Sequence, residues 1–274
     1  MSATELTAVD DIAGHYDQMA GLIEIMGGNN HVGYWTGDED RTPLLGALNR
    51  LTDVVGEKLD LQPGQHLLDI GCGVGVPAIQ LGQCVEAHIT GVTISNWQVQ
   101  EGTRRVRAAG LRGQVQIEYG DAAALAYPDE TFDAVLVFQS LQHASDLGQW
   151  LREMVRVLRP GGRVVLTEFL EEAPLTEEEI EILHAGAMQR PLRCEDLLEV
   201  IRVNGTVIEE VIDCGDRIRR SYPAYFDRLE RYWGVLAGTF GEQRLQQWQE
   251  AMGALLPIYR DKIGYVIVTG HKPT

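Results

Sequence analysis

The chain has 274 residues, 45% of them hydrophobic, which suits one α/β domain with an elaboration or two small domains. Its net charge of −17 disfavours a nucleic-acid substrate, because binding to a phosphate backbone requires a basic face. No window reaches the roughly 20 apolar residues of a membrane span, and four scattered cysteines without a C-x-x-C pair favour reduced thiols in a cytoplasmic protein.

Helical patterns occupy the first part of the chain. An apolar-periodic segment lies within the first 35 residues and ends in the turn-rich stretch GGNNHVGYW. Residues 43–60 carry leucine and valine at helical spacing. We therefore expect residues 1–60 to form an N-terminal helical lid.

From residue 61 onward, short apolar runs alternate with helical patterns. This alternation predicts a parallel sheet with helices on both faces, and we expect residues 61–170 to form this core. The apolar runs cover 66–70, 87–92, 114–119, 133–138 and 163–170, and the helical patterns cover 76–84, 96–109 and 146–158.

The pattern changes after residue 170. Thr176 and Glu179 have the spacing of a capping box at the start of an acidic helix. Residues 217–260 predict one or two long helices, and 264–272 predicts a closing strand. We expect residues 171–274 to add cap helices and closing strands to the same domain, with most of the aromatic side chains there serving helix packing.

Three glycines, Gly71, Gly73 and Gly75, follow the first strand of the alternation. Small residues at the carboxyl end of a strand let the backbone approach a nucleotide-like ligand. The glycine spacing differs from that of the dinucleotide fingerprint, and no acid follows in TGVTISNWQ, where that fingerprint places one. Asp69, two residues before the first glycine, is placed to meet an ammonium group and to repel a pyrophosphate.

Five motifs fall in the order and spacing of class I S-adenosylmethionine-dependent methyltransferases: LLDIGCGVGVPA, GVTISNWQV, YGDAAALAY, FDAVLVFQSLQHASD and LREMVRVLRPGGRVVLTEF. The chain most resembles the branch with an H-x-G-Y-W segment, here His31–Trp35, and a terminal GYV strand. That branch includes small-molecule O-methyltransferases of antibiotic and glycoside tailoring, and it is similar to sarcosine and dimethylglycine N-methyltransferases, tocopherol C-methyltransferases and cyclopropane synthases. The resemblance implies a Rossmann-like, doubly wound, mostly parallel seven-stranded sheet with a helical lid and cap.

The resemblance also implies S-adenosyl-L-methionine as cofactor and assigns residues to its methionine part. The three loop glycines would form the backbone floor under the methionine and ribose. Asp69 would order the amino group, and Gln139 would face the methionine tail. Tyr16 resembles a tyrosine that closes over the carboxylate.

A second group of residues is assigned to the nucleoside. Thr93, Ser95 and Gln98 stand where the family contacts the ribose, and Asp121 and Ala122 resemble the pair that binds the adenine. Two of these assignments have a structural alternative. Ser95 and Gln98 also have the spacing of a capping box, and Asp121 also suits the cap of a short helix.

Methyl transfer to a hydroxyl needs a base to remove the proton, and histidine is the natural choice because its ordinary pKa lies near neutrality. His143 comes just past the fourth strand, and it aligns with a histidine that related O-methyltransferases use as a base. The alternative is a histidine that positions substrate or caps the helix at Asp146. His66, His88 and His271 fall in or beside strands, where we expect structural roles.

Glu168 ends the fifth strand, across the same expected mouth. It could orient His143, bind a substrate hydroxyl, take a proton in a C-methyltransferase, or be a solvated strand-end carboxylate. His31 and Trp35 of the lid, His184 and Tyr222 are weaker candidates for substrate contacts. No His and carboxylate cluster has the spacing of metal ligands, so we expect no metal site.

These observations favour a methyltransferase that acts on a small-molecule substrate, at a hydroxyl of an apolar or aromatic secondary metabolite. A C- or N-methyltransferase is the first alternative. The second is a cyclase or binding module that holds the cofactor without transferring its methyl, because one fold hosts unrelated functions.

Overall fold

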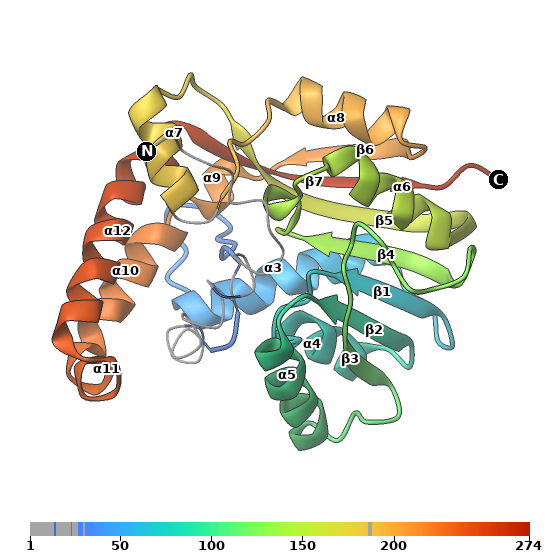
Figure 1. Cartoon of the computed structure of the whole chain (residues 1–274), viewed down its shortest axis with the longest axis horizontal. Helices are drawn as coiled ribbons and strands as arrows, with labels where there is room; N and C mark the ends of the chain where they lie inside the picture. Colours follow the sequence, from blue (N-terminus) through green and yellow to red (C-terminus); the bar gives the residue numbers. More distant parts are fainter. Residues whose placement is uncertain (1–13, 15–22, 24–26, 30, 186–187) are drawn as a thin grey trace.

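A seven-stranded β-sheet runs through the centre of the computed structural model, which describes residues 14, 23, 27–29, 31–185 and 188–274 (Figure 1). The strand order is β3-β2-β1-β4-β5-β7-β6. All neighbours are parallel except β7, which is antiparallel to both β5 and β6. The strands are β1 (His66–Ile70), β2 (His88–Thr93), β3 (Val115–Tyr119), β4 (Phe132–Phe138), β5 (Leu158–Glu171), β6 (Val207–Asp213) and β7 (Ile263–His271). The expected seven-stranded, mostly parallel sheet is confirmed.

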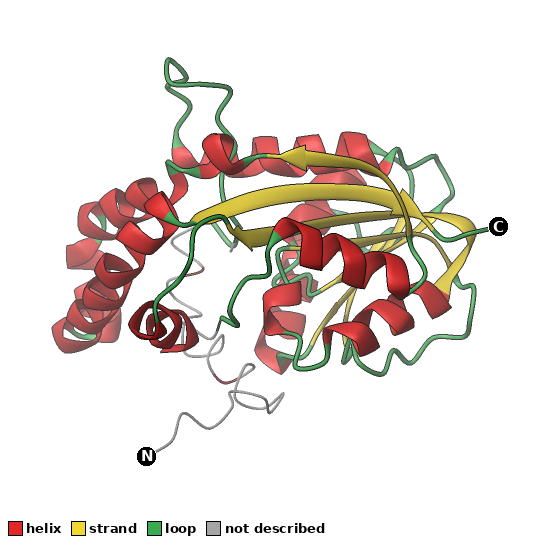
Figure 2. Ribbon diagram, turned by 90° about the horizontal axis from the view of Figure 1, so that it is seen from above, coloured by secondary structure: helices red, strands yellow, loops and turns green. Residues whose placement is uncertain are grey.

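Helices cover both faces of the sheet (Figure 2). Alternate residues of each strand point to opposite faces, and they build two separate apolar clusters. One cluster joins the sheet to α3 (Leu44–Leu59), α4 (Val76–Cys84) and α5 (Asn96–Ala108). The other joins it to α6 (Leu147–Val157) and α8 (Cys194–Val203). The sheet is therefore doubly wound.

The remaining helices follow β5 and β6. Thr176 and Glu179 form the expected capping box at the start of α7 (Glu177–Ala185): the Thr176 hydroxyl accepts from the Glu179 N–H at 3.2 Å, and the Glu179 carboxylate accepts from the Thr176 N–H at 2.8 Å. The region expected to hold one or two long helices contains α9 (Gly215–Ile218), α10 (Ser221–Arg231), α11 (Trp233–Phe240) and α12 (Glu242–Asp261).

The last three of these helices pack together beside the sheet as a cap around their own small apolar cluster (Figure 1). Gly241 ends α11 with a φ of 82°, which is the left-handed region that favours glycine and turns the chain into α12.

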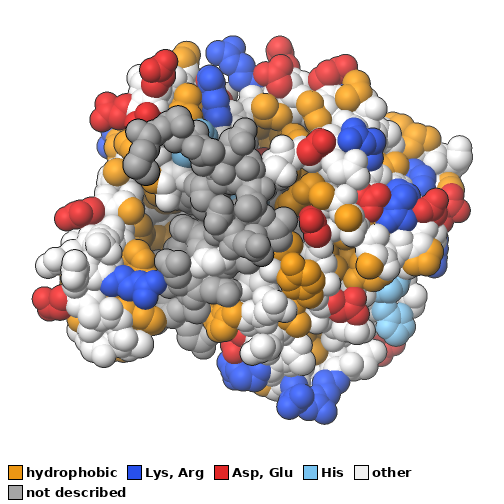
Figure 3. Space-filling model, in the orientation of Figure 1, with side chains coloured by type: hydrophobic (Ala, Val, Ile, Leu, Met, Phe, Trp, Pro, Cys, Tyr) orange, Lys and Arg blue, Asp and Glu red, His pale blue; other side chains and the backbone are white. Residues whose placement is uncertain are grey.

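Acidic and basic side chains are interspersed over the face of the molecule in Figure 3. In the part of the chain that the structure describes, no helix has both the length and the apolar character of a bilayer span.

The sheet topology fixes where a ligand can bind. The chain crosses from β1 to β2 in one direction and later from β3 back to β4 on the other side of β1. Helices leave a crevice at such a reversal, beyond the carboxyl ends of the strands. The glycine-rich loop after β1 and the turn after β4 meet at this crevice.

Candidate active site

The three loop glycines have left-handed backbone, with φ of 76° at Gly71, 56° at Gly73 and 75° at Gly75. They differ in what surrounds them. A Cβ on Gly71 would lie 2.5 Å from the Cβ of Ser140, and a Cβ on Gly75 would lie 2.8 Å from a side-chain carbon of Ile117. A Cβ on Gly73 would meet nothing within 4 Å. Gly71 and Gly75 therefore allow close packing of the protein on itself, whereas Gly73 leaves space open.

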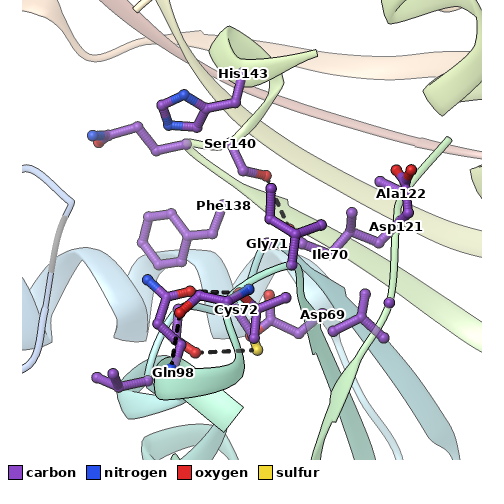
Figure 4. Close-up of a pocket in the computed structure, with 18 of the residues that line it drawn as sticks. Asp69, Ile70, Gly71, Cys72, Gln98, Asp121, Ala122, Phe138, Ser140 and His143 are labelled. Carbon is purple, nitrogen blue, oxygen red and sulfur yellow. Dashed lines mark hydrogen bonds between the residues drawn. The ribbon is translucent and has the colours of Figure 1, made fainter. Parts of the chain in front are cut away.

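The open space belongs to a cavity beyond the carboxyl ends of β1, β2 and β4 (Figure 4). The space between its lining atoms amounts to about 1240 Å³, part of which is open solvent. Most of the predicted cofactor residues line it, namely Asp69, Gly71, Gly73, Thr93, Ser95, Gln98, Asp121, Ala122 and Gln139. Gly75 is not among the lining residues, because its hydrogen faces Ile117, and Tyr16 lies outside the described residues.

Asp69 gives the cavity its main electrostatic feature. The residue is 1% exposed, and neither carboxylate oxygen has a hydrogen-bond partner among the described residues. Burial alone raises the pKa of this carboxyl to about 7. A buried polar group without a partner costs free energy, so the site fits a ligand that brings a hydrogen-bonding cation to this carboxylate.

Thr93, Ser95 and Gln98 form one hydrogen-bonded group where β2 leads into α5. The Ser95 hydroxyl caps the helix by accepting from the backbone N–H of Gln98 at 3.1 Å. The Thr93 hydroxyl donates to the side-chain oxygen of Gln98. Because this cap bond uses the backbone of Gln98, it does not depend on the Gln98 side chain, which lines the cavity.

Asp121 combines the two roles that the sequence suggested. One carboxylate oxygen accepts from the backbone N–H of Ala123 at 2.8 Å and so stabilises the turn after β3. The residue also lines the cavity, beside the buried Ala122. Turn formation and ligand contact are therefore compatible at this position.

Gln139 and Ser140 shape the wall at the end of β4. Gln139 has a φ of 52°, an uncommon conformation for a residue other than glycine and one that clusters at functional sites. Its side-chain oxygen accepts from the N–H of Val32 at 3.1 Å, which ties the segment after residue 30 to the cavity. Ser140 donates to the carbonyl of Ile70 at 2.9 Å. The sequence analysis missed Ser140. The only signal for it is that a small residue is needed beside a glycine loop that is distant in the sequence.

His143 ends the short 3-10 helix η1 (Leu141–His143), directly after this wall, and lines the cavity (Figure 4). Its backbone N–H donates to the carbonyl of Ser140 at 3.1 Å. The side-chain amide of Gln142 donates to His143 Nε2, with 3.3 Å between the nitrogens. The structure thus brings His143 to the same cavity as the predicted cofactor residues.

Glu168 lies on the other side of this turn and does not line the cavity. It is 7% exposed, so a solvated strand-end carboxylate is wrong. Its two oxygens accept from the backbone N–H groups of Phe169 at 2.8 Å and Gln142 at 3.1 Å. Burial, the largest influence, raises the pKa of this carboxyl to about 7. Glu168 therefore holds the backbone of the turn that carries His143.

The two lid candidates have different surroundings. His31 lines the cavity, and its ring stacks on Phe138 with centroids 4.3 Å apart and an interplanar angle of 18°. Burial lowers its pKa to about 4, and Nδ1 donates to the carbonyl of Val32 at 2.9 Å, so the imidazole is neutral at physiological pH. Trp35 is 2% exposed and packs in an apolar cluster with α3, away from the cavity. We therefore assign Trp35 to the core, where its indole N–H donates to the carbonyl of Thr42.

The two candidates after residue 170 also lie away from the cavity. Tyr222 on α10 stacks on Tyr259 of α12, with centroids 3.6 Å apart, and belongs to the packing under the cap. His184 is half-buried on α7. His66, His88 and His271 lie at the opposite end of the strands from the cavity. His66 begins β1, His88 begins β2, and His271 ends the antiparallel strand β7. Within the described ranges, no group of three His, Cys, Asp or Glu side chains is arranged to hold a metal ion.

Comparisons with known proteins find related sequences over most of the chain. A family model described as a methyltransferase domain matches residues 68–166. Methyltransferase GfsG of Streptomyces halstedii is 32% identical over 96% of this chain and 94% of its own length. The 27-O-demethylrifamycin SV methyltransferase of Amycolatopsis mediterranei is 33% identical over 96% and 97%.

Solved structures extend the comparison to the whole fold. The [4+2]-cyclase SpnF superposes with a TM-score of 0.87 at 32% identity, covering 97% of each chain. The cyclopropane synthase MmaA2 from Mycobacterium tuberculosis has a TM-score of 0.86 at 17% identity, covering 98% of this chain and all of the other, so it shows a shared fold alone.

Proposed function

The chain belongs to the S-adenosylmethionine-dependent methyltransferases, and we propose that it methylates a hydroxyl group of an apolar or aromatic small molecule in natural-product biosynthesis. The observation that carries this proposal is the cavity wall that holds His143, a candidate base, together with the predicted cofactor residues. The names of the two relatives, one a methyltransferase and one an O-demethylrifamycin methyltransferase, support it.

The cofactor fits the residues that are present. The unpartnered carboxylate of Asp69 would bind the ammonium group of the methionine part, which provides the missing hydrogen-bond donors and the opposite charge. The open space over Gly73 would admit the ligand close to the backbone. Thr93 and Gln98 would hold the ribose hydroxyls, and Asp121 would bind the adenine amine.

The cofactor, when bound, supplies a methyl group that its sulfonium has already activated. The protein must then position an acceptor hydroxyl and remove its proton. His143 Nε2 is the proposed proton acceptor, because its lone pair already accepts from the Gln142 amide and a hydroxyl can take the place of that donor. Nε2 would take the hydroxyl proton as the acceptor oxygen gains the methyl group, while the methyl–sulfur bond of the cofactor would break and leave S-adenosylhomocysteine.

Two further residues position this base. Gln142 holds the imidazole until the acceptor hydroxyl replaces its amide, and Glu168 holds the backbone of the turn through the Gln142 N–H. Neither role requires either side chain to exchange a proton during the reaction.

Methyl-labelled S-adenosylmethionine incubated with a panel of phenols, glycosides, amines and prenyl diphosphates tests the proposal. Label on a phenol or a glycoside hydroxyl is the expected result. Label confined to an amine or to a carbon atom of a prenyl chain would refute hydroxyl transfer and favour N- or C-methylation.

A cyclase that holds the cofactor without transferring methyl is the second candidate, and the 32% identity to the [4+2]-cyclase SpnF favours it. A cyclase of this kind would release no labelled product from any acceptor. It would convert a molecule that carries both a diene and an alkene, and S-adenosylhomocysteine would support its rate as well as S-adenosylmethionine does. A methyltransferase would stop when S-adenosylhomocysteine replaces the methyl donor.

A further inference from the structure

The charged side chains on the described wall of the cofactor cavity are carboxylates. Asp69 and Asp121 line the cavity, whereas no lysine or arginine is among its described lining residues. Residues 1–30 and 186–187, which include every position outside the structural description, contain no lysine or arginine in the sequence. The net charge of −17 adds a negative field around the whole molecule. An anionic ligand therefore finds no lysine or arginine to pair with on the described wall.

Arg105 of α5 lies close to the cavity without lining it. A Cβ on Gly28, which is a lining residue, would overlap the Arg105 guanidinium. This guanidinium is already paired, because its Nε donates to the carboxylate of Glu101 at 2.7 Å. The Glu101 side chain is 14% exposed, so drawing Arg105 into the cavity would break a largely buried ion pair.

The two histidines of the cavity wall do not supply a positive charge either. The ring of His31 stacks on Phe138, and its Nδ1 donates to the carbonyl of Val32. Its Nε2 lies 3.4 Å from the hydroxyl of Thr52, which is 1% exposed. Both nitrogens of this neutral ring thus face groups of the protein. His143 must be neutral before it accepts a proton, as the proposed function requires.

The helix that begins beside His143 is also a poor place for an anion. Asp146 caps α6, and its carboxylate accepts from the backbone N–H of Gln149 at 2.8 Å. A negative side chain at this position offsets the positive end of the helix dipole. A carboxylate or phosphate of a ligand would have to compete with Asp146 there.

We propose that the cavity selects the methyl acceptor by charge: it takes hydroxyl compounds that are uncharged or cationic, and it rejects those that carry a carboxylate or phosphate near the hydroxyl. An anionic group would lose its hydration without gaining a cationic partner, and Asp121 would repel it. The word acceptor rests on the proposed function, whereas the selection of a hydroxyl compound by charge does not.

The positive groups of the cofactor do not remove this selection. The sulfonium is positive beside the methyl group that is transferred, where the acceptor oxygen must lie. It therefore cannot pair with an anionic group elsewhere on the acceptor. The ammonium group of the methionine part would be paired with Asp69.

Three compounds with one naphthol frame test the proposal by equilibrium dialysis near neutral pH, with saturating S-adenosylhomocysteine present. Methyl 6-hydroxy-2-naphthoate is uncharged, 6-hydroxy-2-naphthoate carries a carboxylate, and 6-(aminomethyl)-2-naphthol carries an ammonium group. The acid and the amine are both charged and hydrated, so their difference reports the sign of the charge.

Ser145→Arg supplies a cation at a lining position two residues after His143. Ser145 is exposed, so a long side chain does not disturb the core. Ser145→Gln is the matched control, because it adds a long polar side chain without charge.

We expect the ester to bind the parent and the acid to bind it about tenfold or more weakly, with the amine bound more tightly than the acid. Ser145→Arg should bind the acid several-fold more tightly than Ser145→Gln does, while the two variants bind the ester alike. Failure of the ester to bind the parent, an acid that binds as tightly as the ester or the amine, or equal binding of the acid to the two variants would each overturn the proposal. A protein that binds the probes in the expected order but methylates no hydroxyl compound supports selection by charge and refutes the proposed function alone.

Discussion

The carboxylate of Glu168 accepts a hydrogen bond from the backbone N–H of Gln142 at 3.1 Å, and so joins the end of β5 to the turn that carries His143. Its other oxygen accepts from the N–H of Phe169. Position 168 shares a face of β5 with Leu166 and Leu170, both of which belong to the apolar cluster under α6 and α8. A carboxylate on this face acts on the base through the backbone and makes no hydrogen bond to its imidazole among those described.

Glu168→Ala should lower kcat while leaving the affinity for S-adenosylhomocysteine within about twofold, since Glu168 does not line the cofactor cavity. Two buried N–H groups lose their acceptor, and each costs about 1–3 kcal/mol of unfolding free energy. Urea denaturation measures this loss. Glu168→Gln keeps one acceptor oxygen and should recover part of the stability and of kcat. Equal loss of kcat in both variants would instead favour Glu168 as the proton acceptor.

Asp69 should make cofactor binding depend on pH. Its pKa is about 7 in the free protein, and only the ionised form pairs with an ammonium group. The association constant for S-adenosylhomocysteine should therefore rise by up to about tenfold per pH unit below pH 7 and level off above it. Isothermal titration at several pH values measures this slope, and Asp69→Asn should bind weakly with no slope in that range. A parent profile as flat as that of the variant would contradict the assignment.

The raised pKa of Asp69 also predicts how the free energy of unfolding of the free protein changes with pH. Between the ordinary carboxyl pKa and about 7, the unfolded chain has lost the Asp69 proton while the folded protein retains it. The folded state binds more protons, so the free energy of unfolding falls as pH rises through this window and is constant above it. Glu168 contributes in the same direction, because burial also raises its pKa to about 7.

Gly73→Ala should weaken S-adenosylhomocysteine binding, because the new methyl group points into open cavity space. The left-handed backbone at this position costs about 1–2 kcal/mol for any other residue, which lowers the melting temperature of the free protein. Gly64→Ala is the matched control: Gly64 also has a positive φ and open space, but it does not line the cavity. Thermal-shift titration should show a ligand-induced shift in the control and little or none in Gly73→Ala.

Gln98 and Ser95 should separate affinity from stability. Ser95→Ala removes the hydroxyl that caps α5 and should cost about 1 kcal/mol of unfolding free energy. Gln98→Ala leaves that cap in place and removes a side chain that lines the cavity, so it should lower the affinity for S-adenosylhomocysteine by about tenfold. Loss of stability without loss of affinity in Gln98→Ala would show that the side chain serves structure alone.

Alternation of strands and helices predicted the parallel part of the sheet because each element has a strong period of its own. The position of β6 was not predicted, since an edge strand with exposed Val207 and Val211 lacks a buried face to mark it. The number of helices after residue 217 was not predicted either, because the break between α11 and α12 depends on the backbone of Gly241.

The sequence could place Asp69 and Gln139 at the cavity, because Asp69 lies near the carboxyl end of β1 and Gln139 directly follows β4. Their contacts with a cofactor stay a prediction. Contacts between segments far apart in the sequence carry no local pattern, so the packing of Gly71 on Ser140 and of Gly75 on Ile117 could not be foreseen. The face on which Glu168 lies could have been inferred from the alternation along β5.

His143→Ala is expected to lower kcat for a hydroxyl acceptor by about 10² to 10⁴, the usual contribution of a positioned base. The affinity for S-adenosylhomocysteine should change by no more than about twofold, because the loop glycines and Asp69 remain. Imidazole added to the medium should restore part of the rate in His143→Ala, since it can take the proton from the space that the side chain leaves. His184→Ala is the control: this half-buried histidine on α7 does not line the cofactor cavity, and its removal should leave the rate and the imidazole response unchanged. If His143→Ala keeps nearly the full rate, the proposed proton transfer to Nε2 is wrong. A loss of rate in Glu168→Gln would then identify Glu168 as the proton acceptor and favour methylation of a carbon atom.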